Sequence, residues 1–323
     1  MKIFIAAALL LGLLSLNLSQ ENPFGVMLTG PMALSLRVEV AQTLGAVYFR
    51  PESLFLDRWN GGCPACDAVM SAGLKLVLTV RANGPGPTTP PSDLVTYRST
   101  LRSVLARYRP EVLVVENEEN SALFYTGTPE QYGAELQAAC EVAHQRGVPC
   151  TNGGLVSALV ALLVYHHYLE IGDHARAQDF LSRVFTPEQQ QWLNTPRARE
   201  QLEKGKRLLA IYKTAGIDYV NFHWYIADPG ALGEAVAYLH EQTGLPVLTN
   251  EVGQLTDDPN QTWAIMSMIV ELRLPIAIWF AQDGPQARGL INRDGSLRPT
   301  GEAFQRFIQQ HFPKTSRPMM QGP

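Results

Sequence analysis

The sequence has no cluster of basic residues and little charge overall. Lysine and arginine number 26 against 30 aspartates and glutamates in 323 residues, for a net charge of -4, and charged residues make up 17% of the chain. A nucleic-acid-binding surface needs lysines and arginines gathered on one face to neutralise phosphates. The composition therefore excludes nucleic acid as an expected partner, and an apolar fraction of 46% excludes a disordered chain.

Beyond its start, the chain has no apolar run that approaches the roughly 20 residues needed to cross a bilayer. The exception follows Met1-Lys2, where an almost unbroken apolar run extends from Ile3 to Leu16. A basic start before such a run is typical of a secretory signal peptide. We predict a signal peptide over residues 1–20 and a secreted or periplasmic mature protein without an integral membrane span. The cleavage position, and retention of the segment as an N-terminal anchor, are left open.

Cysteine is scarce, with four residues in the chain. Cys63 and Cys66 form a single C-x-x-C, and the second such pair that a zinc ribbon needs is missing. In an oxidising compartment four cysteines can pair in three ways. Helical spacing turns Cys140 toward the sheet, and Cys150 lies near the start of the next strand. We therefore predict a Cys140–Cys150 disulfide, with Cys63 bridged to Cys66 or left as a local dithiol.

Apolar, β-branched segments alternate with helix-like segments along the chain. The predicted strands are residues 24–28, 46–49, 74–80, 112–115, 148–152, 219–222, 246–249 and 276–280. Eight strands separated by helices indicate parallel β/α units, and several strands are continuous apolar runs, as expected when both faces are buried. We predict an α/β fold, a (β/α)8 TIM barrel that forms one catalytic domain over residues 21–313, with a flexible tail at 314–323.

The connection between the fifth and sixth predicted strands is too long for one helix. Residues 153–217 contain two further helix starts, Thr186-Pro187 and Thr195-Pro196. We predict a helical insertion here. Because loops that follow the strands of this fold surround the active site, we expect the insertion to narrow the cleft and help to select substrate.

Three histidines and a glutamate gather within this predicted insertion: His166, His167, Glu170 and His174. Such residues can bind zinc, so a metal-dependent hydrolase, which a chelator would inactivate, is a rival enzyme class. On an amphipathic helix they are more often solvated or packed. We therefore predict no metal and no cofactor.

Polar residues concentrate where the predicted strands end. They are Arg50 after the second strand, Glu116-Asn117-Glu118-Glu119 after the fourth, His223-Trp224-Tyr225 after the sixth, Asn250-Glu251 after the seventh, and Trp279 in the eighth. Enzymes with a (β/α)8 barrel carry out their chemistry at this end of the strands. Two carboxylates on nearly opposite strands can flank one bond, as glycosidic cleavage requires.

This pattern resembles the superfamily of retaining glycoside hydrolases with catalytic glutamates on barrel strands four and seven, the clan A type. The resemblance implies Glu118 as acid/base and Glu251 as nucleophile of an exported enzyme that cleaves β-glycosidic bonds of an oligo- or polysaccharide by double displacement. The substrate-binding residues expected with them are Arg50, Asn117, His223, Tyr225, Trp279, Trp59 and Trp224, of which the three tryptophans are candidates for stacking on sugar rings.

Two further glutamates bracket the predicted acid. Strand alternation would turn Glu116 to the same side as Glu118, and a nearby like charge raises a carboxyl pKa. Whether Glu116 or Glu119 perturbs or replaces Glu118 is therefore left open. Arg81 and Asn83, after the third strand, are further subsite candidates.

A different functional class also fits the sequence. The alternative is a catalytically inactive barrel that binds carbohydrate or serves as a scaffold in the cell envelope. We expect a monomer, and sugar identity, linkage and endo or exo action are left open.

Overall fold

The computed structural model describes residues 20–282 and 289–313. The predicted signal peptide, up to residue 19, and the predicted tail at 314–323 lie outside these residues. The main strands are β1 Phe24–Thr29, β2 Tyr48–Phe49, β4 Lys75–Arg81, β5 Val112–Val115, β6 Cys150–Asn152, β7 Val220–Trp224, β8 Val247–Val252 and β9 Ala277–Gln282. They pair in parallel in the order β6-β5-β4-β2-β1-β9-β8-β7, and a short strand, β3 Leu54–Phe55, pairs with β4.

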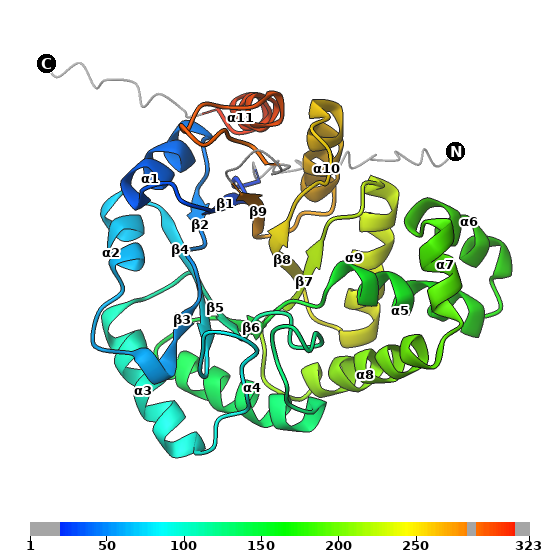
Figure 1. The fold of residues 1–323 in the computed structure, drawn as a ribbon, viewed down its shortest axis with the longest axis horizontal. Helices are drawn as coiled ribbons and strands as arrows, with labels where there is room; N and C mark the ends of the chain where they lie inside the picture. The colour runs from blue at the N-terminus through cyan, green and yellow to red at the C-terminus, as the bar shows by residue number, and fades with distance from the viewer. Residues whose placement is uncertain (1–19, 283–288, 314–323) are drawn as a thin grey trace, which may run out of the picture.

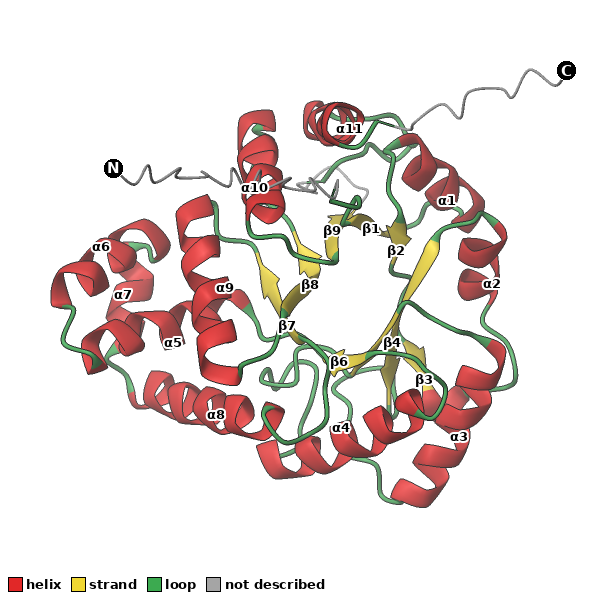
Figure 2. Cartoon of the chain, turned by 180° about the vertical axis from the view of Figure 1, so that it is seen from behind, coloured by secondary structure: helices red, strands yellow, loops and turns green. Residues whose placement is uncertain are grey.

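The sheet closes on itself between β6 and β7. Parallel bridges join Thr151 to Tyr219 and Leu155 to Phe222. The His223 amide donates to the Leu155 carbonyl oxygen at 2.8 Å and so continues the contact past the end of β6. Figures 1 and 2 show the resulting ring of strands with helices around it, which confirms the predicted (β/α)8 barrel.

Helices surround the barrel in the order expected of β/α units. They are α1 Leu34–Thr43, α2 Pro64–Ser71, α3 Leu94–Arg107, α4 Pro129–His144, α5 Ser157–Glu170, α6 His174–Val184, α7 Pro187–Leu193, α8 Pro196–Tyr212, α9 Pro229–Thr243, α10 Pro259–Glu271 and α11 Pro299–His311, with the 3-10 helix η1 Leu56–Arg58. At α4 the Thr128 side chain accepts from the Gln131 amide and the Gln131 side chain accepts from the Thr128 amide, the capping box that the sequence predicts.

Four helices, α5 to α8, connect β6 to β7. Figures 1 and 2 show α6 and α7 on the outside of the molecule, whereas α8 lies closer to the barrel beside α4. Gly205 lets α8 approach α5 closely, because a Cβ at this position would lie 2.9 Å from the Leu159 side chain. The role of this segment in substrate selection stays a prediction.

Apolar side chains fill two layers that alternate along each strand. Inside the barrel, the buried cluster consists of Tyr48, Val77, Val112, Val114, Leu248, Ile276 and Ile278. The larger cluster lies between strands and helices. Within β9, Ile278 belongs to the inner cluster and Trp279 to the outer one, as the twofold period of a strand requires. This alternation decides which side chains at the strand ends can reach the site.

Both predicted cysteine pairs lie at disulfide distance. The Cα atoms of Cys140 and Cys150 are 5.3 Å apart, and those of Cys63 and Cys66 are 5.2 Å apart. The first bridge ties the inner face of α4 to the start of β6. Two disulfides are typical of a protein outside the cytoplasm. No helix in the described part of the chain is both long and apolar enough to span a membrane.

Candidate active site

Three of the predicted site residues meet at one end of the barrel. Glu118 follows β5, His223 lies in β7 and Glu251 lies in β8. His223 Nδ1 is 2.9 Å from Glu118 Oε1 and 3.7 Å from Glu251 Oε1. One carboxylate oxygen of each glutamate and a ring nitrogen of His223 all lie within 4.8 Å of one another. Glu118 and Glu251, here called the carboxylate pair, are therefore close enough to act on one bond.

Glu251 is held by donors on two sides. Arg50 Nη1 lies 2.6 Å from Glu251 Oε2, and the Tyr225 hydroxyl donates to Oε1 at 2.7 Å. Burial disfavours the charged form, but His223, Arg50 and Tyr225 together hold the pKa of the Glu251 carboxyl below its ordinary value. Burial and the Glu251 charge raise the pKa of Tyr225 well above its ordinary value, so its hydroxyl stays a donor. Glu251 is thus ionised and fixed in orientation.

Arg50 connects several strand ends from inside the barrel. Its side chain is 2% exposed, and Nη2 donates to Asn117 Oδ1 at 2.6 Å. It also donates from Nε to Thr79 Oγ1 and from Nη1 to the Asn250 carbonyl oxygen, both at 3.1 Å. Loss of one partner of a buried ion pair typically costs about 3–5 kcal/mol. Arg50 therefore supports the fold as well as the orientation of Asn117 and Glu251.

Glu116 points away from the carboxylate pair. Glu116 and Glu118 both have left-handed backbones, with φ of 66° and 45°. Such strain in non-glycine residues typically marks functional sites. Because β5 ends before Glu116, strand alternation no longer applies, and the prediction that the two side chains share one side is wrong. The Glu116 carboxylate accepts from the Ala82 amide and from Thr88 Oγ1, both at 2.6 Å, while Glu118 faces His223.

Glu119 is also engaged elsewhere. Its buried carboxylate accepts from Asn152 Nδ2 at 2.9 Å and hydrogen-bonds the Tyr212 hydroxyl of α8. Burial raises the pKa of this carboxyl above its ordinary value. Of the three glutamates in this segment, Glu118 is the one that lies beside Glu251. Its predicted role therefore has geometric support that Glu116 and Glu119 lack.

A second pair of buried carboxyl groups lies behind the site. Glu135 of α4 is buried close enough to Glu116 for each carboxyl to affect the pKa of the other, and it accepts from the Tyr125 hydroxyl at 3.0 Å. Burial raises the pKa of both carboxyls, and the charge of Glu116 raises that of Glu135 further. Arg81 Nε, 3.5 Å from Glu116 Oε2, favours the charged form of Glu116. The folded protein therefore favours the protonated form of Glu135. Arg81 supports this pair rather than a subsite.

Glu135→Gln is expected to reduce the pH dependence of stability. The folded protein binds the Glu135 proton more tightly than the unfolded chain does. Its stabilisation is therefore complete below the ordinary carboxyl pKa and is lost as the pH rises from there through the raised folded-state pKa. Urea unfolding of the wild type should show that the free energy of unfolding declines from about pH 5 to pH 9. The slope should be steeper than in the variant by up to about 1.4 kcal/mol per pH unit. Glu141→Gln, on an exposed position of α4, is the control. Equal slopes for all three proteins would contradict the raised pKa of Glu135.

Two of the predicted sugar-stacking residues do not reach the site. Trp224 and Trp279 are both fully buried. Trp279 packs edge-on against Phe304 of α11, with ring centroids 5.8 Å apart, and Trp224 packs against Phe222 at 6.0 Å. Both indoles face the helical layer, so neither offers a face to a sugar ring. The prediction that Trp224 and Trp279 stack on sugar rings is therefore wrong.

Phe280 is the aromatic residue that the sequence analysis missed. It follows Trp279 and, by alternation from Ile278, faces the inside of the barrel. Its partly exposed ring lies 6.2 Å from that of Tyr225, centroid to centroid. The outward position of Trp279 and the inward position of Phe280 could have been found by continuing the alternation of β9. Trp59 lies elsewhere, packed edge-on against Tyr108 at 6.1 Å.

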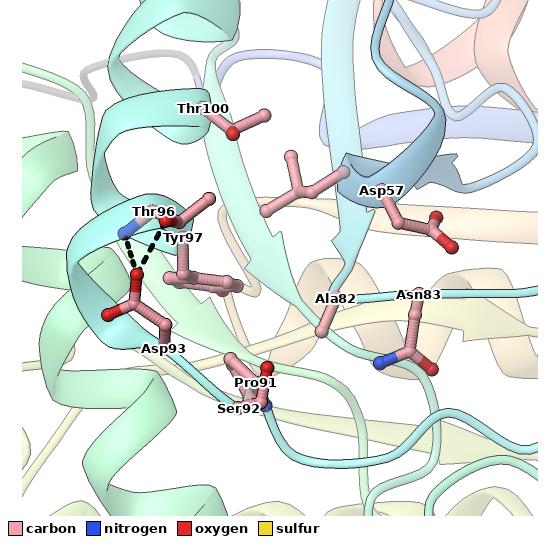
Figure 3. Close-up of a pocket in the computed structure, with 10 residues that line it drawn as sticks. Asp57, Ala82, Asn83, Pro91, Ser92, Asp93, Thr96, Tyr97 and Thr100 are labelled. Atoms are coloured by element: carbon pink, nitrogen blue, oxygen red, sulfur yellow. Dashed lines mark hydrogen bonds between the residues drawn. The ribbon is translucent and has the colours of Figure 1, made fainter.

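A separate cavity lies beyond the end of β4. It has a volume of about 300 Å³ and is bounded by η1, the loop after β4 and the start of α3. Figure 3 shows Asp57 and Asn83 on one side and Asp93 with Thr96 on the other. The carboxylate pair does not line this cavity, which is therefore not the reaction centre. Asn83 keeps its position as a candidate for a distal subsite.

Within residues 20–282 and 289–313, the one group of side chains placed to hold a metal ion is the carboxylate pair with His223. In the segment between β6 and β7, Glu170 instead pairs with Lys206 at 2.6 Å. At the carboxylate pair, the Arg50 guanidinium lies 2.6 Å from Glu251 and opposes a bound cation.

No family model and no curated protein matches the chain. Solved structures do match. A glucosidase from Croceicoccus marinus is 13% identical with a TM-score of 0.62, over 91% of this chain and 69% of that one. A GH128 endo-β-1,3-glucanase from Pseudomonas viridiflava is 16% identical with a TM-score of 0.54, over 88% and 97%. Another from Amycolatopsis mediterranei, in complex with laminaritriose and laminaribiose, is 13% identical with a TM-score of 0.53, over 88% and 98%. The chain therefore shares the (β/α)8 barrel fold of these glucosidase and glucanase structures.

Proposed function

We propose that the protein is an exported, retaining glycoside hydrolase that cleaves β-glycosidic bonds. The observation that carries the proposal is the short separation of the carboxylate pair, in which an oxygen of Glu118 and an oxygen of Glu251 lie within 4.8 Å. Retaining enzymes hold their carboxyl groups about 5–5.5 Å apart, and inverting enzymes need about 6.5–9.5 Å to admit a water molecule. The spacing favours double displacement.

The environments of the two carboxyl groups divide the roles. Glu251, ionised and aimed by Arg50 and Tyr225, attacks the anomeric carbon while Glu118 gives a proton to the departing glycosidic oxygen. The carbon–oxygen bond breaks, and a glycosyl ester forms on Glu251. Glu118, now ionised, takes a proton from water. That water attacks the anomeric carbon and releases Glu251 as a carboxylate.

The substrate class follows from the structural neighbours and the aromatic side chains. The neighbours are a glucosidase and endo-β-1,3-glucanases, one of them bound to laminari-oligosaccharides. Phe280 and Tyr225, in contact beside Glu251, supply an apolar surface suited to a pyranose face. We therefore propose a β-glucan as the substrate. We also propose that the enzyme is a monomer. The apolar N-terminal run and the two disulfides support export.

Hydrolysis of aryl β-glucosides and soluble β-glucans by the purified protein tests this function. Proton NMR of the first product should show the β-anomer before mutarotation, because two displacements retain configuration. An α-anomer would indicate an inverting enzyme. Glucan binding without any hydrolysis would instead support the catalytically inactive barrel.

A further inference from the structure

Three buried asparagines link neighbouring strands beneath the carboxylate pair. Asn152 of β6, Asn221 of β7 and Asn250 of β8 are all 0% exposed. Asn152 Oδ1 accepts from the Asn221 amide at 2.7 Å, and Asn152 Nδ2 donates to the Asn221 carbonyl oxygen at 2.9 Å. Because these partners belong to the backbone, the Asn152 side chain has one possible orientation. We call the three residues the asparagine chain.

Backbone partners also fix the orientation of the Asn221 side chain, and Asn221 in turn fixes that of Asn250. Asn221 Oδ1 accepts from the Asn250 amide at 2.9 Å, and Asn221 Nδ2 donates to the Asn152 carbonyl oxygen at 3.0 Å. Asn221 Nδ2 also donates to Asn250 Oδ1 at 2.7 Å. Reversing either amide would place two donors or two acceptors together. The oxygen of the Asn250 side chain must therefore face Asn221.

That oxygen also faces the ring of His223. Asn250 Oδ1 lies 3.0 Å from His223 Nε2, and a carbonyl oxygen can only accept, so Nε2 carries a hydrogen. The ring edge also packs against the backbone at Gly154, where a Cβ would lie 2.3 Å from Nε2. His223 Nδ1 is consequently the nitrogen that faces Glu118 Oε1, at 2.9 Å. In the neutral ring this nitrogen is an acceptor.

We propose that Asn250, oriented by the asparagine chain, is a positioning residue that fixes the tautomer of His223 so that Nδ1 shares one proton with Glu118. This inference rests on the proposed role of Glu118 as acid/base. When the His223 ring is neutral, the shared proton resides on Glu118, which can donate it to the departing glycosidic oxygen. Once Glu118 has lost it, the Nδ1 lone pair faces a carboxylate, and this unfavourable contact favours proton capture from water in the second step.

The charged groups around His223 support the sharing. They are Glu118 and Glu119 after β5, Glu251 of β8 and Arg50 after β2. Burial lowers the pKa of the ring, and Arg50 acts in the same direction, but Glu251 and Glu118 raise it, with a net rise above the ordinary value. The two glutamates therefore favour a proton on the His223 ring, whose Nδ1 lies 2.9 Å from Glu118 Oε1.

Asn250→Asp tests the inference with little structural change. Asn250 Nδ2 has no hydrogen-bond partner among the described residues, so a carboxylate oxygen in its place breaks no bond. A negative charge at Nε2 favours the doubly protonated ring. The alkaline limb of the pH profile of kcat/KM should shift to higher pH by about 1–3 units. Asn260→Asp, at an exposed position of α10, is the matched control and should leave the limb unchanged. A reduced kcat with an unmoved limb would overturn the inference.

Nitrogen-15 NMR of the His223 ring in the wild type tests the tautomer directly. The ring signals are assigned by their loss in His223→Gln, and the measurement requires neither Asn250→Asp nor enzymatic activity. The expected neutral tautomer carries its hydrogen on Nε2. A neutral ring protonated on Nδ1 would overturn the inference. If the tautomer is as expected and no glycoside is hydrolysed, the proposed function fails while the effect of Asn250 on His223 stands.

Discussion

Glu251→Gln is expected to abolish turnover of every glycoside, with kcat lowered on the order of 10⁴-fold or more. Glutamine has the same shape and can still contact Arg50 and Tyr225, but its neutral amide cannot attack the anomeric carbon. Glu116 and Glu119 cannot replace it from their present positions, because each is bound in a separate network. Initial rates with an activated aryl β-glucoside measure the loss.

The control for this variant is Glu302→Gln, at an exposed position of α11 far along the chain from the site. It makes the same chemical change and should retain wild-type rates. A thermal unfolding curve of Glu251→Gln separates loss of chemistry from loss of fold. Turnover within tenfold of wild type in folded Glu251→Gln would rule out Glu251 as nucleophile.

Glu118→Ala should separate the two chemical steps. An aryl glucoside with a dinitrophenyl leaving group needs no protonation, so it should still form the glycosyl ester. The second step then lacks its base, and kcat should fall by about 10²–10⁴-fold. Azide, an anion that attacks without deprotonation, should restore the rate and yield a β-glucosyl azide. Stopped-flow release of dinitrophenol should show a burst followed by a slow steady state.

Wild type and Glu302→Gln should show no acceleration by azide, since both keep the base. Glu119→Gln provides a second comparison, because Glu119 lies next to Glu118 in sequence but bonds Asn152 and Tyr212 instead. Azide rescue of Glu119→Gln, or none in Glu118→Ala, would assign the acid/base to a different carboxyl.

The barrel could be predicted because eight segments rich in apolar and β-branched residues alternate with helix signals, and several of them are continuous apolar runs. The short strand Leu54–Phe55 escaped prediction, because two residues cannot display a period. Closure between β6 and β7 rests on two isolated bridges, one from Thr151 within β6 and one from Leu155 beyond its end. Such contacts depend on tertiary placement and leave no local pattern.

Within the site, the sequence prediction grouped polar residues at the strand ends, and the structure brings three of them together, while their role in substrate binding stays a prediction. Arg50, His223 and Tyr225 all contact the carboxylate pair. The sequence prediction failed where side-chain direction matters, because Trp279 faces the helices and Glu116 leaves the strand in a left-handed turn. Left-handed glutamates have no sequence signature, since glycine is the residue expected in that conformation.

The asparagine chain was also missed in the sequence. Each of its members lies within or at the end of a different strand, and no local pattern connects the three. Only the parallel pairing of β6, β7 and β8 brings Asn152, Asn221 and Asn250 into register. A polar residue at an inward position of three consecutive strands is the signal that could have indicated such a network.

Trapping the glycosyl ester tests the assignment of the nucleophile most directly. A 2-deoxy-2-fluoro-β-glucoside with a dinitrophenyl leaving group slows both steps and accumulates the ester on the attacking residue. Mass spectrometry of a digest should find one fluorosugar on the peptide that contains Glu251, and none in the Glu251→Gln protein. A label on Glu116, Glu118 or Glu119, or a product of inverted configuration with no label, would contradict Glu251 as the nucleophile of a retaining enzyme.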